Sequence, residues 1–276
     1  MTAPHASVDG IHGQDLDLAY HGNPVVHNAS IDFVASRVTA LVGPNGSGKS
    51  TLLRSIARLH RPDRGEVRFD DGTPAVDLSP VEFARRVTLL SQSRPTPNGV
   101  TVRDVVGYGR HPYRGRWRAA DPDGPRAVAW AMDVTGVTGM AERGVDELSG
   151  GEAQRVWLAT CLAQQARVLL LDEPTTFLDL HYQMEILDLV RDLADDHGVA
   201  VGVVLHDLNQ AAAVADHVVL MQDGRVRAAG PPAEVLTEAA LSEAYGIRIE
   251  VRTDPETGLL STRPIGRHTQ RTRQPA

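Results

Sequence analysis

The residues most able to do chemistry lie at 43–50, where GPNGSGKS matches the pattern G-x-x-x-x-G-K-[ST]. The apolar run VTALV precedes this loop, and the helical pattern TLLRSIARLH follows it. In that setting the glycines let backbone N–H groups turn inward around phosphate oxygens, and the new helix adds the positive end of its dipole. Lys49 would reach the β- and γ-phosphates of a nucleotide, and Ser50 would offer its hydroxyl to Mg²⁺. The alternative is a structural glycine turn, but the full pattern arises by chance in only about one chain of this length in a hundred. The residues expected around the nucleotide are Gly43, Pro44, Asn45, Gly46, Ser47, Gly48, Lys49, Ser50 and Thr51.

A second chemical position is the acidic end of VLLLDE, residues 168–173. A buried strand of this kind places Asp172 at the carboxyl edge of a sheet, where nucleotide sites of open α/β sheets lie. We expect Asp172 to hold Mg²⁺, directly or through water, and Glu173 to polarise the attacking water. Taken alone, an acidic strand end is more often a solvated terminus; the phosphate loop earlier in the chain favours the functional interpretation.

Composition limits the possible classes of protein. The chain has 276 residues and a formal net charge of −7, which argues against a general nucleic-acid surface. No positively charged, apolar leader opens it and no apolar run approaches the roughly 20 residues of a membrane helix, so we expect a soluble protein that reaches a membrane through partners. Lys49 is the only lysine among 28 Lys and Arg residues, which indicates that this position needs a compact ammonium group that the planar guanidinium of arginine would not replace. The single cysteine, Cys161, fits a reducing cytoplasm and is expected to be a small buried core residue, with a reactive thiol as the alternative.

The elements that must position these residues alternate along the chain. Strand patterns at DLDLAYHG and after an Asn-Pro turn lead into the phosphate loop, and GEVRFDDG and VTLLSQ are further strands. Between 93 and 165 the character changes to helices, the first opened by the capping box TVRD. VLLLDE and VAVGVVLHD then restore strand–helix alternation, which predicts an α/β fold around a parallel sheet. HVVLMQDGRVRAAG is expected to form a hairpin turning at Asp223-Gly224, and PPAEVLTEAALSEAYG a helix started by Pro.

LSGGEAQR, residues 148–155, resembles the signature sequence of the ABC ATPase family. The other markers of that family also appear along the chain, in the expected order and at suitable spacing. Gln92 resembles the Q-loop glutamine, Asp179 the D-loop aspartate, and His206 the switch histidine, while Tyr20 resembles the aromatic residue that stacks on adenine. Glu152 stands where the signature often has Gln, and the D-loop reads FLD where SALD is frequent, but the serine, the glycines and the aspartate are intact.

The resemblance implies a fold and a division of the chain. The fold is a P-loop NTPase with a RecA-like core sheet, an N-terminal antiparallel β subdomain and an inserted helical subdomain. A single ABC ATPase domain is expected over 12–250. Its β subdomain and P-loop core occupy 12–92 and 166–250, and its helical subdomain occupies 93–165. Residues 1–11 are expected to be a flexible N-terminus, and 251–276 a C-terminal extension ending in a frayed, Arg-rich tail, for which a membrane-surface role is the alternative.

The resemblance also implies roles for individual residues. Glu173, His206 and Gln92 would act on the attacking water and the γ-phosphate, with Gln92 also contacting Mg²⁺ beside Ser50 and Asp172. The predicted nucleotide-binding set also includes Tyr20, Ser149, Gly150, Gly151 and Asp179. Ser149, Gly150 and Gly151 open an apolar helix, an anion-seeking arrangement that makes sense if it completes the site of a second copy in a C₂ dimer. A plain helix N-cap is the alternative for this segment, and packing against the sheet is the alternative for Tyr20.

The implied function is an ATPase, with ATP and Mg²⁺ as ligands, on the cytoplasmic side of the cell membrane as a peripheral subunit. Its partners would be a second copy, transmembrane permease subunits and, indirectly, a substrate-binding protein, with no nucleic acid. The permease contact is expected on the loop after Gln92 and on TVRDVVGYGRHPYRGRW, with Tyr108, His111, Tyr113 and several arginines exposed; a solvated polar face is the alternative. VVGYGRHPY, DEPTTFLDLHYQ and LHDLNQAAAVADHVVLMQDGRV resemble importer ATPases for ferric siderophores, haem and cobalamin, and ferric siderophore is the first choice.

Other classes fit less well. DNA-repair and chromosome-organising ABC proteins need long coiled-coil arms or zinc modules, and translation-associated ABC factors need two ATPase units in one chain. A non-hydrolysing binding module would not need both Glu173 and His206. An exporter would usually carry fused membrane helices.

Overall fold

The computed structural model describes residues 10–91, 99–114 and 121–266. Their central sheet has the strand order β5-β6-β7-β3-β8-β9, in which β9 is antiparallel to β8 and the other pairs are parallel. These strands are β3 (Val38–Val42), β5 (Val87–Leu90), β6 (Val168–Asp172), β7 (Ala200–Val204), β8 (His217–Gln222) and β9 (Arg225–Gly230). The runs VTALV, VLLLD and AVGVV are buried along their whole length, as expected for parallel strands covered on both faces.

Alternate side chains of the central strands enter two different hydrophobic cores. On β6, Leu169 and Leu171 pack with the helices, whereas Val168 and Leu170 pack toward the N-terminal strands. This follows from the period of two along a strand, which sends successive side chains to opposite faces. Cys161 is buried in the first core, as predicted.

A separate antiparallel sheet has the order β2-β1-β4, with β1 (Ile11–Tyr20), β2 (Asn23–Phe33) and β4 (Arg64–Phe69). The turn between β1 and β2 is the pair His21-Gly22, at φ 51° and 81°. The predicted Asn-Pro turn is therefore wrong. A two-residue hairpin turn of this type needs positive φ at both positions, which the ring of Pro24 forbids, so Asn23 and Pro24 belong to β2.

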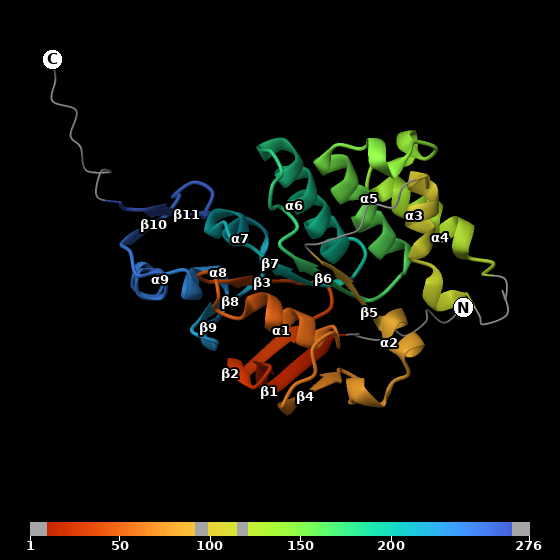
Figure 1. The fold of residues 1–276 in the computed structure, drawn as a ribbon. Helices are drawn as coiled ribbons and strands as arrows, with labels where there is room; N and C mark the ends of the chain where they lie inside the picture. Colours follow the sequence, from red (N-terminus) through yellow and green to blue (C-terminus); the bar gives the residue numbers. More distant parts are fainter. Residues whose placement is uncertain (1–9, 92–98, 115–120, 267–276) are drawn as a thin grey trace, which may run out of the picture.

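Among the described residues between β5 and β6, the regular elements are α-helices and 3-10 turns, with no strand. Figure 1 shows α3, α4 and α5 gathered at one end of the molecule, opposite the C-terminal strands. Thr101 and Asp104 form the predicted capping box at the start of α3. Gly109 lets the end of α3 approach α5, because a Cβ atom there would lie 2.0 Å from the carbonyl oxygen of Thr160. The helices are α1 (Lys49–Ile56), α2 (Pro80–Arg86), α3 (Val102–Tyr108), α4 (Gly124–Val134), α5 (Gly150–Ala163), α6 (Leu180–Asp195), α7 (Leu208–Val214), α8 (Pro232–Val235) and α9 (Glu238–Tyr245), with 3-10 turns at Ala75–Asp77, His111–Tyr113, Thr138–Met140 and Val145–Glu147.

The ends of the chain differ from the prediction in three places. Ile11 begins β1 and is fully buried, so the flexible N-terminus does not extend to residue 11. The frayed tail is wrong for 261–264, because β10 (Ile249–Thr253) pairs with β11 (Leu260–Pro264). The single helix expected after Pro231 is two helices, because Thr237 starts a new one by accepting a hydrogen bond from the N–H of Ala240, 3.3 Å away. The turn at Asp223-Gly224 between β8 and β9 is as predicted.

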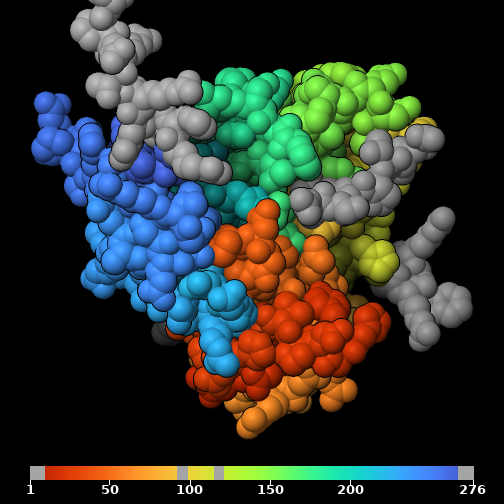
Figure 2. Space-filling model, turned by 60° about the vertical axis from the view of Figure 1, so that its left-hand side comes forward, coloured from red at the N-terminus to blue at the C-terminus, as the bar shows by residue number. Residues whose placement is uncertain are grey.

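Figure 2 shows the red and orange N-terminal strands and helix on the lower part of one face, the blue C-terminal elements beside them and the green helices above. None of the helices in the described part of the chain is both long and apolar enough to span a bilayer.

Candidate functional site

The loop between β3 and α1 has the backbone of a phosphate cradle. Gly43, Gly46 and Gly48 adopt φ values of 141°, 78° and 97°, which side-chain-bearing residues rarely accept. Gly43 is also required sterically, since a Cβ atom there would lie 2.0 Å from the carbonyl oxygen of Met221. The loop therefore depends on glycine both for its dihedral angles and for its close contact with β8.

Lys49 lies at the first position of α1 with its ammonium group inside this loop. Nζ donates to the carbonyl oxygens of Gly43 and Pro44 at 2.8 and 2.9 Å, and the residue is only 5% exposed. Burial lowers the pKa of Lys49 below its ordinary value, an effect opposed by the nearby charges of Glu173 and Asp172. A plain glycine turn would have no use for a buried cation at its centre, so this geometry favours an anion site.

The predicted metal position brings two residues together from distant parts of the chain. The hydroxyl of Ser50, at the start of α1, donates to Oδ1 of Asp172 at 2.6 Å. Asp172 ends β6, is 1% exposed, and also accepts from Arg54 at 3.1 Å. Arg54 was not predicted; its place one helical turn after Ser50 on the same helix is the signal that could have found it.

Glu173 and His206 meet at the carboxyl edge of the sheet. They follow β6 and β7, which are adjacent parallel strands with Asp172 opposite Val204. Nε2 of His206 lies 2.7 Å from Oε1 of Glu173. Glu173 has φ 56°, in the left-handed region, so its backbone turns sharply as the strand ends.

A cavity of about 430 Å³ joins these groups. Its lining is Val25, Asn45, Gly46, Gly48, Lys49, Ser50, Thr51, Glu173 and His206. Val25 was not predicted, and β2 brings it there because Gly48 packs against the backbone of that strand. The phosphate loop and two of the three residues expected to act on the water and the γ-phosphate, Glu173 and His206, therefore share one space.

Other predicted residues lie elsewhere. Ser149 is exposed and caps α5, accepting from the N–H of Glu152 at 3.3 Å, while the Glu152 carboxylate accepts from the N–H of Ser149 at 2.8 Å. Asp179 caps α6 and accepts from the N–H of Tyr182 at 3.1 Å. Gly150 follows Ser149, and the ring of Tyr182 covers Gly151 so closely that a Cβ atom would lie 2.6 Å away. The cavity lining contains neither this signature segment nor Asp179.

Two predicted residues are not placed at the cavity. Tyr20 ends β1, is 39% exposed, and its ring centroid lies 4.4 Å from that of His60. Its contact with adenine stays a prediction. Gln92 lies outside the described residues.

A glycine loop between a parallel strand and a helix, with a buried lysine and an acidic neighbouring strand end, defines a P-loop NTPase. The family model described as "ABC transporter" matches residues 26–176. The chain is 40% identical over 264 residues to the ferric enterobactin transport ATP-binding protein FepC of Escherichia coli (strain K12), covering 95% of this chain and 96% of that protein. It is 42% identical over 270 residues to the hemin import ATP-binding protein HmuV of Thermobifida fusca (strain YX), covering 96% and 93%. The dimeric structure of MJ0796, a bacterial ABC transporter cassette, superposes with a TM-score of 0.70 at 26% identity, covering 80% of this chain and 98% of that one.

The chain belongs to the ABC transporter family. It is an ATP-binding subunit of that family and an ATPase, which confirms the predicted fold, family and enzyme class.

Proposed function

We propose that this chain is the ATPase of a ferric siderophore importer, working as a homodimer with Mg²⁺-ATP on the cytoplasmic face of the membrane. The observation that carries the proposal is the single cavity in which the glycine loop, Lys49 and the Glu173–His206 pair come together. Phosphoryl transfer to water needs mainly positioned groups and compensating charge, and this cavity supplies both.

The residues present fit both ligands. Lys49 donates two hydrogen bonds to loop carbonyl oxygens, which hold its ammonium group inside the loop. From there the cation can meet phosphate oxygens together with the N–H groups of the loop and of the first turn of α1. Ser50 and Asp172 offer hard oxygen ligands 2.6 Å apart, the chemistry Mg²⁺ prefers when phosphates and waters complete its shell. Bound Mg²⁺ would neutralise charge on the phosphates. Glu173 would accept the proton of the attacking water, and His206 would hold that carboxylate in place through its 2.7 Å contact.

A second copy of the chain accounts for the residues that lie outside the cavity. Ser149 and Gly150 form an exposed helix N-terminus, which can receive the γ-phosphate bound by a partner copy. Near Asp179, the apolar side chains of Phe177 and Leu180 are 95% and 72% exposed, which is costly in a monomer and suits a protein contact. Two copies related by a two-fold axis would complete both sites at once.

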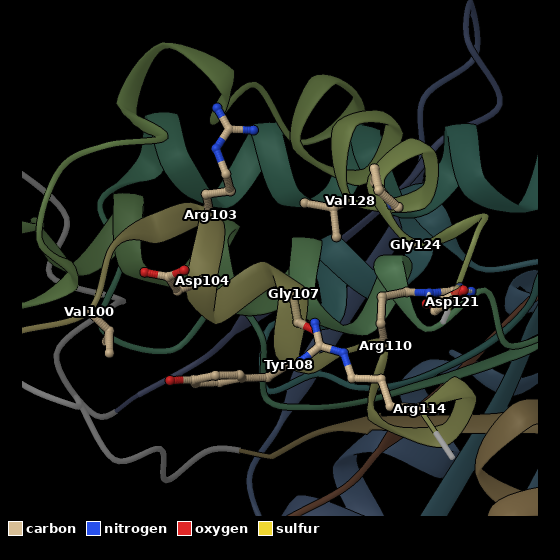
Figure 3. Close-up of a pocket in the computed structure, with 11 residues that line it drawn as sticks. Val100, Arg103, Asp104, Gly107, Tyr108, Arg110, Arg114, Asp121, Gly124 and Val128 are labelled. Atoms are coloured by element: carbon tan, nitrogen blue, oxygen red, sulfur yellow. Dashed lines mark hydrogen bonds and ion pairs between the residues drawn. The ribbon is translucent and has the colours of Figure 1, made fainter. Parts of the chain in front are cut away.

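The helical region offers the contact for a permease. A cavity of about 800 Å³ lies against α3 and α4, and Figure 3 shows Arg103 and Tyr108 beside it. Tyr108 is 47% exposed, as predicted, and His111 is exposed. Among the nearby arginines, Arg103 and Arg114 are exposed, as expected, but the expectation that Tyr113 is exposed is wrong. Tyr113 is half-buried against the guanidinium groups of Arg85 and Arg110, and Arg110 is 2% exposed.

The substrate class follows from the relatives. FepC is named for ferric enterobactin, and the similar proteins of Dickeya dadantii and Bacillus subtilis are named for achromobactin and for iron(3+)-hydroxamate. We extend ferric siderophore to this chain, with haem as the next candidate because of HmuV. A substrate-binding protein would deliver the cargo to the permease, which this chain would contact from the other side of the membrane.

The proposal is tested first at the site. Glu173→Gln should trap an ATP-bound dimer, seen by gel filtration with ATP and Mg²⁺, because the substrate stays bound when the water is not activated. Adding Lys49→Ala should abolish that dimer, and Glu256→Gln, at an exposed loop position, should leave ATP turnover at the wild-type rate. A Glu173→Gln protein that stays monomeric under these conditions would exclude the shared site. The substrate is tested by deleting the gene and measuring uptake of iron-labelled siderophore and of haem; loss of haem uptake alone would replace siderophore by haem.

A further inference from the structure

The segment that follows Glu173 is held weakly by its own backbone. Glu173 and Phe177 both adopt left-handed φ values, 56° and 64°. The backbone bonds inside the segment are long: Thr176 donates to the Glu173 carbonyl oxygen at 3.4 Å and Leu178 to that of Thr175 at 3.4 Å. Groups outside the segment must therefore hold this unfavourable conformation.

Three glutamine side chains from different helices supply those groups. Gln154 on α5 donates to the carbonyl oxygen of Pro174 at 2.6 Å. The other two, Gln210 and Gln183, are linked to each other. The hydroxyl of Thr175 donates to Oε1 of Gln210 on α7 at 3.0 Å. Nε2 of Gln210 donates to Oε1 of Gln183 on α6 at 2.7 Å. Nε2 of Gln183 donates to the carbonyl oxygens of Leu178 and Thr175, at 2.9 and 3.4 Å. The bonds close a ring from Thr175 through both amides and back to the segment.

The direction of every bond in this ring follows from the two backbone carbonyl oxygens. A carbonyl oxygen only accepts, so Gln183 must present its NH₂ group to Leu178 and Thr175. Its own amide oxygen then faces α7, and Gln210 must turn its NH₂ group toward that oxygen. The oxygen of Gln210 is left for the hydroxyl of Thr175, which is 8% exposed. Methionine and ionised glutamate, which have the same length, cannot replace either glutamine, because each amide must donate at one end and accept at the other.

We infer that Gln210 and Gln183 are positioning residues that fix Glu173 against His206; the inference rests on the proposed ATPase site. His206 lies on the segment that leads into α7, and Gln210 lies one helical turn beyond it. Thr175 lies two residues after Glu173. The Thr175–Gln210 bond therefore ties the loop carrying the carboxylate to the helix following the histidine, at the place where their side chains approach to 2.7 Å. Figure 1 shows α6 and α7 side by side above the sheet, which lets Gln183 close the ring.

Steady-state ATP hydrolysis tests the inference. Gln210→Met and Gln183→Met keep the side-chain length but cannot donate or accept as an amide does. Each should lower kcat about tenfold and leave KM for ATP within about twofold, because a displaced catalytic group costs rate while the phosphate loop is untouched. The double variant should fall no further than either single one, since both break one ring. The matched control is Gln222→Met, whose amide oxygen accepts from Arg227 at 2.9 Å on the β8–β9 hairpin and which should keep the wild-type kcat.

Gln210→Glu gives an independent test. At neutral pH its carboxylate can accept from Thr175 but cannot donate to Gln183, so two acceptor oxygens would face each other and kcat should fall at least as far as in Gln210→Met. Wild-type kcat in Gln210→Met and Gln210→Glu would overturn the inference. So would a rise in KM that accounts for the whole loss of kcat/KM, or a double variant in which the two substitutions lower kcat independently. Failure of the proposed function is a different result: wild type and Lys49→Ala would then hydrolyse ATP equally slowly. Should either methionine variant fail to fold, as judged by circular dichroism, the other variant and Gln210→Glu decide the question.

Discussion

Arg110 is the charged residue whose removal the structure predicts to be most damaging to the helical region. It lies just after α3 and is 2% exposed. Its guanidinium group donates to both carboxylate oxygens of Asp121, at 2.8 and 2.9 Å, and to Ala163 O and Gln165 Oε1, each at 2.9 Å. It also lies 3.8 Å from the ring centroid of Tyr113. Figure 3 shows Arg110 and Asp121 directed toward each other.

Arg110→Ala should lower the free energy of unfolding by about 3–5 kcal/mol. The reason is that Asp121 would keep its charge, at 10% side-chain exposure, without its partner. The hydrogen bond to Arg110 is the main cause that holds the pKa of Asp121 below its ordinary value. When the arginine is removed, the N–H of Gly124 and the charge of Arg114 still favour the ionised carboxylate, but its buried guanidinium partner is gone. Arg110→Met combined with Asp121→Asn should cost less than the sum of the single changes, because the lone charge is then gone.

The assay is urea unfolding followed by far-UV circular dichroism at pH 7. The matched control is Arg126→Ala on α4, whose pair with Asp123 spans 3.2 Å with side chains 82% and 63% exposed. An exposed pair of this kind is worth at most about 1 kcal/mol. Equal losses in Arg110→Ala and Arg126→Ala, or a loss under about 1 kcal/mol in Arg110→Ala, would refute the reasoning from burial.

Three further predictions concern stability and assembly. Burial alone would lower the pKa of His12, but hydrogen bonds to two aspartates raise it above its ordinary value of 6.5. The free energy of unfolding should therefore be higher in wild type than in His12→Gln, and this difference should be complete below about pH 6.5 and decline as the pH rises through the folded-state pKa. A difference in urea titrations that does not depend on pH would contradict this. Thr262 is 9% exposed and its hydroxyl donates to Asn209 at 3.1 Å, so Thr262→Val should lower the free energy of unfolding by about 1 kcal/mol, and an unchanged urea midpoint would show that this bond contributes nothing. Phe177→Asp, added to the trapping variant at Glu173, should weaken the ATP-dependent dimer about tenfold or more in gel filtration at graded concentrations; an unchanged dimer would remove Phe177 from the interface.

The parts of the site that could be predicted from sequence are those whose chemistry is local. The phosphate loop needs glycines, a lysine and a hydroxyl in one short run, and an apolar run ending in Asp172 and Glu173 identifies a buried strand edge. His206 is different, because a histidine at a strand end has little meaning alone and was predicted only through the family resemblance. Its meeting with Glu173 requires β6 and β7 to be neighbours, which is a property of the sheet.

The parts that sequence missed depend on contacts between distant segments. Tyr113 was expected to be exposed because it lies among arginines and glycines, yet the α2 and α3 regions bring Arg85 and Arg110 against its ring. The polar, Arg-rich character of residues 261–266 suggested fraying, but β11 is stabilised by pairing with β10 and by the bonds between Thr262 and Asn209 on α7. No local sequence pattern predicts these long-range contacts, since neither partner stands out from the residues around it in the sequence.

The groups that follow the strand ends and the signature segment at Ser149 form two parts of the proposed nucleotide site, and the fold fixes the first part more firmly than the second. The register of the parallel strands sets the first part: Asp172 lies opposite Val204, and Leu41 of β3 lies opposite the same residue on its other side. The groups that follow these strand ends therefore meet at one sheet edge without any partner. Ser149 has no such support, because its only described side-chain role is to cap α5 at an exposed end. A substitution at Asp172 should therefore weaken nucleotide binding by the monomer. A substitution at Ser149 should leave nucleotide binding by the monomer unchanged and weaken only the ATP-dependent association of two copies.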